Sequence, residues 1–365
     1  MKTATPNNGV SGFSLVELLV AMTILLVISA AALSLFTSHL PLFSEQQNQA
    51  GLNISMRNAV SQMQLDVANA GSGYYQGINI PDFPIGVTIK NNVATSSTPC
   101  NTASTFTYGA NCFDELNVIA IDTSTPPAHP SDSTGTTCVS TQSATIFTTP
   151  IGSTTPAQLA ADFHSGDEVL LVSGTGSSIA SAVLTQDGSV AGGKVKLQHN
   201  GSGANGTYSD PAGIATNPNN KLGIQFCNTD WVLKMNAIKY KVDTSTASDP
   251  KLIREQPAGS TNDVVLAEQI VGFKVGAILW NNCVTTCTSD DASTYNYDSS
   301  TYASGGNAQA YNYSLIRSVQ IEFIGRTTPN FAPTYVFRNG FDSGPYQIES
   351  SSTVLNPRNL SMNNN

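Results

Sequence analysis

Charged side chains are scarce in this chain of 365 residues, where they make up 11% against roughly a quarter in typical globular domains. The 16 lysine and arginine residues are outnumbered by 25 aspartate and glutamate residues, which gives a formal net charge of −9 at pH 7. The few cations form no basic cluster. Because nucleic acids are bound mainly through lysine and arginine contacts to phosphates, the composition excludes a nucleic-acid partner unless folding gathers the cations into a patch.

Residues that could support catalysis or bind a metal are also few and dispersed. The four histidines are His39, His129, His164 and His199. They show neither metal-ligand spacing nor a nucleophile–base pair. Residues 201–206 (GSGANG) have the spaced glycines of a dinucleotide-binding turn but do not lead into a helix, which favours a flexible loop. Asp290, Asp291 and Asp298 could offer oxygen ligands to calcium, although an acidic turn is favoured. We expect no enzymatic activity and no cofactor.

A long apolar run near the N-terminus is the dominant feature that is present. Residues 18–43 carry no charge and exceed the roughly 20 residues that a helix needs to cross a bilayer. A leader with one charged side chain, Lys2, precedes the run. In an ordinary secretory signal the cleavage site follows the apolar region, whereas Gly12 stands before it. Cleavage at Gly12 would therefore leave the apolar segment in the mature protein.

Glu17 is a lone carboxylate at the start of this apolar run, where a charge is costly and usually functional. Cleavage after Gly12 would create a positive amino terminus at Phe13, about one helical turn away. A negative side chain there also suits the helix dipole. The alternative is an uncut signal anchor with Glu17 at the lipid headgroups.

Residues 12–17 (GFSLVE), followed by the apolar helix, resemble the prepilin motif of type IV pilins and of the pseudopilins of type II secretion. The resemblance implies that a prepilin peptidase removes residues 1–12 and that Phe13 is N-methylated. It also implies that the Glu17 carboxylate meets the amino terminus of a neighbouring subunit during filament assembly.

The helix is expected to continue beyond the bilayer as an amphipathic half. Apolar residues recur at helical spacings of three and four at Leu52, Met56, Ala59, Val60, Met63, Val67 and Ala70. Pro41 lies between the two halves and would kink or briefly break the helix. A helix over residues 13–70 would be about 85 Å long, and Gly71 and Gly73 would end it.

An α+β, pilin-like fold follows, in which this helix packs on an antiparallel β-sheet domain with long loops. The expected segments are a leader (1–12), a membrane and assembly helix (13–43), its amphipathic continuation (44–70) and an exported β-rich head (71–365) of one or two subdomains. The expected strands cover residues 115–121, 168–172, 182–185, 194–198, 237–242, 270–275, 318–324 and 334–338. The expected loops cover residues 91–111, 123–149, 201–220 and 282–309.

All six cysteines lie beyond the membrane segment, where an exported domain meets an oxidising compartment. They are Cys100, Cys112, Cys138, Cys227, Cys283 and Cys287. Cys283 and Cys287 favour a local disulfide over zinc because no histidine is near, and Cys100 with Cys112 is the next local candidate. Cys138 and Cys227 would then form a long-range pair, although six cysteines allow 15 connectivities.

Around the last expected loop lie tyrosines among serine, asparagine and glycine: Tyr295, Tyr297, Tyr302, Tyr311 and Tyr313. Such a composition suits an adaptable binding surface, and a solvated insertion braced by its own aromatics is the alternative.

Short landmarks in the C-terminal half occur in an order similar to that of the PilW-type minor pilins: residues 165–169, 252–254, 266–273, 316–326 and 356–360. This resemblance implies a structural minor pilin that acts at the pilus tip or in pilus initiation. It would be held in the inner membrane with a periplasmic head and would then reach the cell surface. Its partners would be the prepilin peptidase/N-methyltransferase and other pilins. The alternatives are a type II secretion pseudopilin and a tip adhesin that uses the tyrosine-rich loop.

Overall fold

The computed structural model describes residues 13–74, 85–92, 101–102, 106–132, 138–139, 141, 143–174, 178–200, 210–212, 222–256, 263–279, 295–299, 316–331 and 335–361. The chain divides into two compact units, Met1–Gly51 and Leu52–Asn365, which are described separately. A single helix, α1 (Leu15–Ala68), contributes to both.

The first unit is the N-terminal part of α1, whose apolar side chains are exposed. Thr23 and Thr37 bond their hydroxyls to carbonyls of the preceding helical turn, so their polar groups are satisfied without water. The helix is uninterrupted at position 41, and the expected brief break is therefore absent from the described backbone. The kink at Pro41 stays a prediction.

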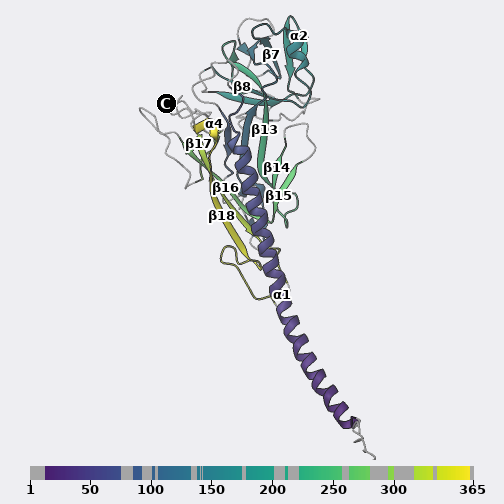
Figure 1. Cartoon of the computed structure of the whole chain (residues 1–365). Coiled ribbons are helices and arrows are strands. Elements are labelled where there is room, and N and C mark those ends of the chain that lie inside the picture. The colour runs from purple at the N-terminus through teal and green to yellow at the C-terminus, as the bar shows by residue number, and fades with distance from the viewer. Residues whose placement is uncertain are drawn as a thin grey trace, which may run out of the picture. The chain divides into compact units, whose positions relative to one another are not determined.

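The second unit begins with the C-terminal part of α1, which buries one face. Buried along it are Leu52, Met56, Ala59, Met63, Val67 and, just after the helix, Ala70. Val60 is partly buried against the same core. These are the residues that the helical spacing predicts. They pack against two sheets, and Figure 1 shows β14 and β15 on one side of the helix and β16–β18 on the other.

The larger sheet has eleven strands and is centred on β13 (Trp231–Asp243), which pairs with β4, β5, β8 and β14. Its other strands are β1 (Val87–Lys90), β4 (Glu115–Ile121), β5 (Ala128–Ser131), β7 (Thr145–Pro150), β8 (Glu168–Val172), β9 (Ile179–Val183), β10 (Ser189–Ala191), β11 (Lys194–Gln198), β14 (Lys251–Glu255) and β15 (Val264–Glu268). The length of β13 allows one strand to pair with β4 and β14 near α1 and with β5 and β8 beyond it.

A second sheet has three strands and contributes most of the remaining core around α1. It consists of β16 (Ile270–Leu279), β17 (Ile316–Arg326) and β18 (Ile348–Leu355). Two small pairs are β2 (Asn101–Thr102) with β3 (Thr107–Tyr108), and β6 (Cys138–Val139) with β12 (Phe226–Cys227). Every described strand pair is antiparallel. The chain thus has the expected α+β arrangement.

Three short helical segments complete the described elements: η1 (Ala110–Cys112), α2 (Pro156–Ala161) and α4 (Arg358–Ser361). α2 begins at a capping box formed by Thr155 and Gln158, and it packs with β7, β10 and β11 around a second hydrophobic core. α4 lies near the end of α1, because the Asn359 amide donates to the Ala70 carbonyl at 3.2 Å. The C-terminal segment therefore closes over the helix terminus.

A partly buried polar cluster on α1 fixes the helix to the larger sheet. The Asp66 carboxylate accepts from Arg254 Nε at 2.6 Å and from Arg254 Nη2 at 3.2 Å. The hydroxyl of the fully buried Tyr240 donates to the same carboxylate. Burial and the Asp66 carboxylate both raise the pKa of Tyr240, so its hydroxyl remains a donor. Any other register of the helix on the sheet would separate Asp66 from Arg254 and leave both charges unpaired.

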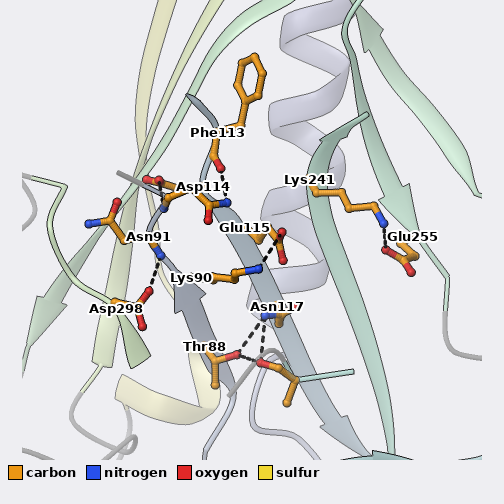
Figure 2. Close-up of polar contacts among 12 residues, drawn as sticks. Thr88, Lys90, Asn91, Phe113, Asp114, Glu115, Asn117, Lys241, Glu255 and Asp298 are labelled. Carbon is orange, nitrogen blue, oxygen red and sulfur yellow. Dashed lines mark hydrogen bonds and ion pairs between the residues drawn. The ribbon is translucent and has the colours of Figure 1, made fainter. Parts of the chain in front are cut away.

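A fully buried carboxylate, that of Asp114, lies just before β4 (Figure 2). Asp114 Oδ1 accepts from Lys274 Nζ at 2.8 Å and from the Asn92 N–H at 3.1 Å. Asp114 Oδ2 accepts from the Val275 N–H at 3.0 Å. Burial raises the pKa of Asp114, and the Lys274 bond opposes that shift. The carboxylate joins the segment after β1, the start of β4 and the middle of β16.

The disulfide Cys138–Cys227 joins β6 to β12, whose two cysteines are paired across the strands. This is the long-range pair that remained after the two local pairs were assumed. Cys112 is buried. Cys100, Cys283 and Cys287 lie outside the described residues, so the two local pairs stay predictions.

Several strand expectations require correction. Residues 335–338 of the expected strand 334–338 form no strand, and the Tyr335 and Phe337 carbonyls accept from Arg338 Nη1 and not from a neighbouring strand. β9 (Ile179–Val183) begins three residues before the expected strand 182–185 and overlaps it at residues 182–183. β18 was missed because its centre is serine and threonine, and its pairing with β17 alone defines it. The expected loops over 91–111 and 123–149 contain short strands.

The Asp66–Arg254 pair predicts the effect of D66N on stability. The substitution keeps the side-chain shape but leaves Arg254 without its counter-ion at a site where the two side chains are 15% and 12% exposed. We expect the free energy of unfolding to fall by about 3 kcal/mol, measured by denaturant unfolding of the full chain in detergent. D263N, at an exposed position before β15, is the matched control and should change it by less than about 0.5 kcal/mol. Equal losses in the two variants would contradict the structural role of the pair.

His199 predicts a pH dependence of stability. Burial lowers the pKa of His199 to about 4 from its ordinary 6.5. Between pH 6.5 and 4 the imidazole of His199 is therefore protonated in the unfolded chain and neutral in the folded chain. The free energy of unfolding is at its full value above pH 6.5 and decreases as the pH falls toward 4. H199Q should reduce this loss by about 3 kcal/mol. Unfolding free energies across this range test it, and parallel curves for the two proteins would contradict it.

Candidate processing and assembly site

Two side chains at the N-terminus of α1 bond reciprocally to the backbone. The Ser14 hydroxyl accepts from the Glu17 backbone N–H at 3.2 Å, and Glu17 Oε2 accepts from the Ser14 backbone N–H at 3.0 Å. The Ser14 carbonyl accepts from the Leu18 N–H at 3.2 Å. Ser14 is therefore the N-cap residue and Glu17 the third helical residue of a capping box.

This capping box was not anticipated from the sequence, although its signature is present there. A serine followed three residues later by glutamate, directly before an apolar run, is the pattern of a helix start. The structure assigns the residue a role within its own chain as well.

The bonds of the capping box matter more in lipid than in water. The first N–H groups of a helix have no partner within the helix, and an apolar solvent offers none. Ser14 and Glu17 satisfy two backbone N–H groups, those of Glu17 and Ser14 themselves. All of the bonded atoms follow Phe13, so the box does not depend on residues 1–12.

The surroundings of Glu17 are apolar along the chain. The segment Leu15–Thr37 is long and apolar enough to cross a membrane, with a mean hydropathy of 2.6, and none of it is buried within the protein. Glu17 is the only charged side chain in residues 13–44. Oε1 of Glu17 contacts no donor among the described residues, so this oxygen can accept a bond from outside the subunit.

The other residues singled out from the sequence are dispersed. Phe13 is 84% exposed, and Gly12 lies outside the described residues. Asp298 accepts from the Asn91 N–H at 2.8 Å (Figure 2), whereas Asp290 and Asp291 are not described. No group of three or more potential metal ligands occurs in the described part of the chain.

The two described tyrosines near the tyrosine-rich loop belong to the fold. Tyr297 is buried in the core around α1, and the Tyr295 hydroxyl accepts from Gln320 of β17 at 3.0 Å. Tyr302, Tyr311 and Tyr313 lie outside the described residues. The described pair supports a braced insertion more than a free contact surface.

Comparison with known families gives one match. Residues 7–33 match the model of the prokaryotic N-terminal methylation motif. The match covers the leader, the residues of the capping box and most of the apolar span. Neither curated proteins nor solved structures yield a match to this chain. The chain therefore carries the prepilin N-terminal methylation motif, which implies processing by a prepilin peptidase.

The motif predicts the outcome of G12V. Removal of the small residue at the cleavage position should block the peptidase, so the chain in membranes should retain residues 1–12 and lack N-methylation. Intact-mass measurement of the purified protein tests this. A matched control is G51A, because no atom lies within 4 Å of a Cβ at that helical position, and G51A should be processed normally. A shortened, methylated G12V protein would contradict the cleavage assignment.

Proposed function

We propose that the protein is a structural minor pilin of a type IV pilus. It is held in the inner membrane by the N-terminal part of α1, cut after Gly12 and methylated at Phe13, and then packed by that helix into a filament or an initiating complex. The observation that carries the proposal is the capped Glu17 within the methylation motif, at the start of a fully exposed apolar span.

Assembly would be a transfer of α1 from lipid to a bundle of like helices. Because lipid is as apolar as the helix, close packing and polar pairing must provide the preference for the bundle. The Glu17 carboxylate could supply such pairing through Oε1, bonded to the methylated amine of a neighbour's Phe13. The capping box holds the carboxylate at the helix end while leaving that oxygen open.

The size of the head supports a low-copy subunit. The compact unit Leu52–Asn365 is large for a repeated element of a closely packed fibre. A position at the tip or in the priming complex avoids that repetition. The similarity in C-terminal landmarks to PilW-type minor pilins supports the same role, and one of these landmarks contains Asn359, which bonds the end of α1.

A type II secretion pseudopilin is the second candidate, favoured by the same methylation motif. Deletion of the gene separates the two functions. Loss of surface fibres and of twitching would support the pilus. Retained fibres with stalled export of secreted enzymes would support the secretion system.

E17Q separates the two roles of Glu17. Glutamine at this position also forms a capping box, so we expect normal processing and membrane insertion, whereas incorporation into sheared fibres should fall at least about tenfold because the charge for the neighbour's amine is lost. Quantitative mass spectrometry of fibres and membranes measures both.

The control for E17Q is S14A, which removes the hydroxyl of the capping box but keeps the carboxylate. Its incorporation, normalised to the processed protein, should stay within about twofold of the natural chain. Wild-type incorporation of E17Q would show that the charge is not used in assembly.

A further inference from the structure

The connection between β17 and β18 leaves the three-stranded sheet beside the first helical residues of the head, Leu52 and Met56. A Cβ at Gly325, near the end of β17, would lie 2.7 Å from Leu52 Cδ1 and 3.0 Å from Met56 Sδ. β18 begins opposite this point, with Ile348 paired to Arg326. We call the described residues of this connection, 327–331 and 335–347, the aromatic loop.

The aromatic loop carries four exposed large apolar side chains within a short stretch of sequence, more than any other described segment of the head. Phe331 is 70% exposed, Val336 89%, Phe341 58% and Phe337 39%. Elsewhere in the described head the exposed large apolar residues are only Ile54 and Leu65 of α1, Val190, Val264, Val265 and Val354, none of them aromatic. Exposed aromatic side chains gathered in one segment suggest a contact with another molecule.

The loop presents these side chains from a fixed backbone. Asn339 Oδ1 accepts from the N–H groups of Phe341 and Asp342 at 2.8 and 3.0 Å, and the Asn339 N–H donates to the Gly344 carbonyl at 3.0 Å. The Asp342 carboxylate is in turn bonded by the hydroxyls of Tyr108 and Tyr346. The exposure of Phe341 is therefore imposed by a bonded turn and does not follow from a loose chain.

Phe331 is supported from inside in a similar way. Its ring lies 6.5 Å from that of Phe106, which meets the buried Tyr346 edge-on at 5.8 Å. Arg326 lies beneath, with its guanidinium 4.9 Å from the Tyr346 ring and its donors used by Gln269, Phe106 and Ser248. The exposed ring thus ends a stack of packed side chains.

The charge of the loop suits a lipid surface. Residues 327–347 carry only two charged side chains, Arg338 and Asp342, in a chain whose net charge is −9. Burial raises the pKa of Asp342, but its hydrogen bonds outweigh that effect and lower it. The two tyrosine hydroxyls bond Oδ2, and Asn339 Nδ2 and the Gly344 N–H bond Oδ1. Arg338 is an exposed cation in a segment rich in aromatic residues, a composition typical of the membrane–water interface.

We propose that the aromatic loop is a membrane-interface anchor, which rests Phe331, Val336 and Phe341 in the headgroup region while the subunit waits in the membrane. The inference rests on the membrane-held stage of the proposed function. Lipid is favoured as the partner because the head is covalently attached, through α1, to the candidate membrane span Leu15–Thr37. A bilayer is therefore present at high effective concentration before any other subunit arrives.

The test places tryptophan at Phe341 in the full chain, reconstituted in vesicles whose acyl chains are brominated near the headgroup. V190W, on β10, is the matched control, since Val190 is 50% exposed. Trp231 and Trp280 are present in all variants. The fluorescence of the protein without an added tryptophan is therefore subtracted, and the quenching of the added tryptophan alone is compared. Interfacial side chains lie about 5–10 Å into the boundary, and we expect bromine to remove roughly half of the emission added by F341W and little of that added by V190W.

A second variant, V336W, shows whether the result depends on the substitution at Phe341 itself, and its added tryptophan should be quenched to a similar extent. Equal quenching of loop and control reporters in protein that floats with the vesicles would overturn the anchor and leave the proposed function intact. Protection of the loop only after other pilins are added would assign it to a protein contact and also overturn the anchor. Failure of the natural chain to float would refute the membrane-held stage itself.

Discussion

The exposed apolar half of α1 is the constraint on which the rest of this structure depends. A helix of 54 residues buries one face of its C-terminal part in the head, while Leu15–Thr37 has no protein around it. Water cannot solvate such a surface without a large free-energy cost. The segment must lie in lipid or among other helices, and in the proposed function the move from the first surroundings to the second is assembly.

Polar groups at both ends of α1 are bonded within the chain, so the hydrogen bonds at its termini and its attachment to the head do not depend on what surrounds the apolar half. Ser14 and Glu17 satisfy backbone donors within the helix itself. At the other end, Asp66 is held by Arg254 and Tyr240, and Asn359 bonds the Ala70 carbonyl. The buried face and these bonds make the second half of α1 an integral part of the head.

Features that follow from local periodicity were predictable from the sequence. The helix face from Leu52 to Ala70 and the strands at 115–121, 168–172 and 194–198 agree with the structure. The serine-rich β18 was not predictable, because only its pairing with β17 makes it a strand. The ion pair of Asp66 with Arg254 joins residues 188 positions apart, which no local pattern encodes. The capping box was present in the sequence and was overlooked.

The most direct measurement is quantitative mass spectrometry of the N-terminal peptide in sheared surface fibres and in the remaining cell envelope. The account requires a peptide that begins at N-methylated Phe13 and occurs in fibres at low copy relative to the most abundant subunit. Met1 retained everywhere would contradict it, because the chain would then be a simple membrane-anchored domain. A processed peptide confined to envelopes would contradict the place in the fibre and would favour a pseudopilin or a primer that stays behind.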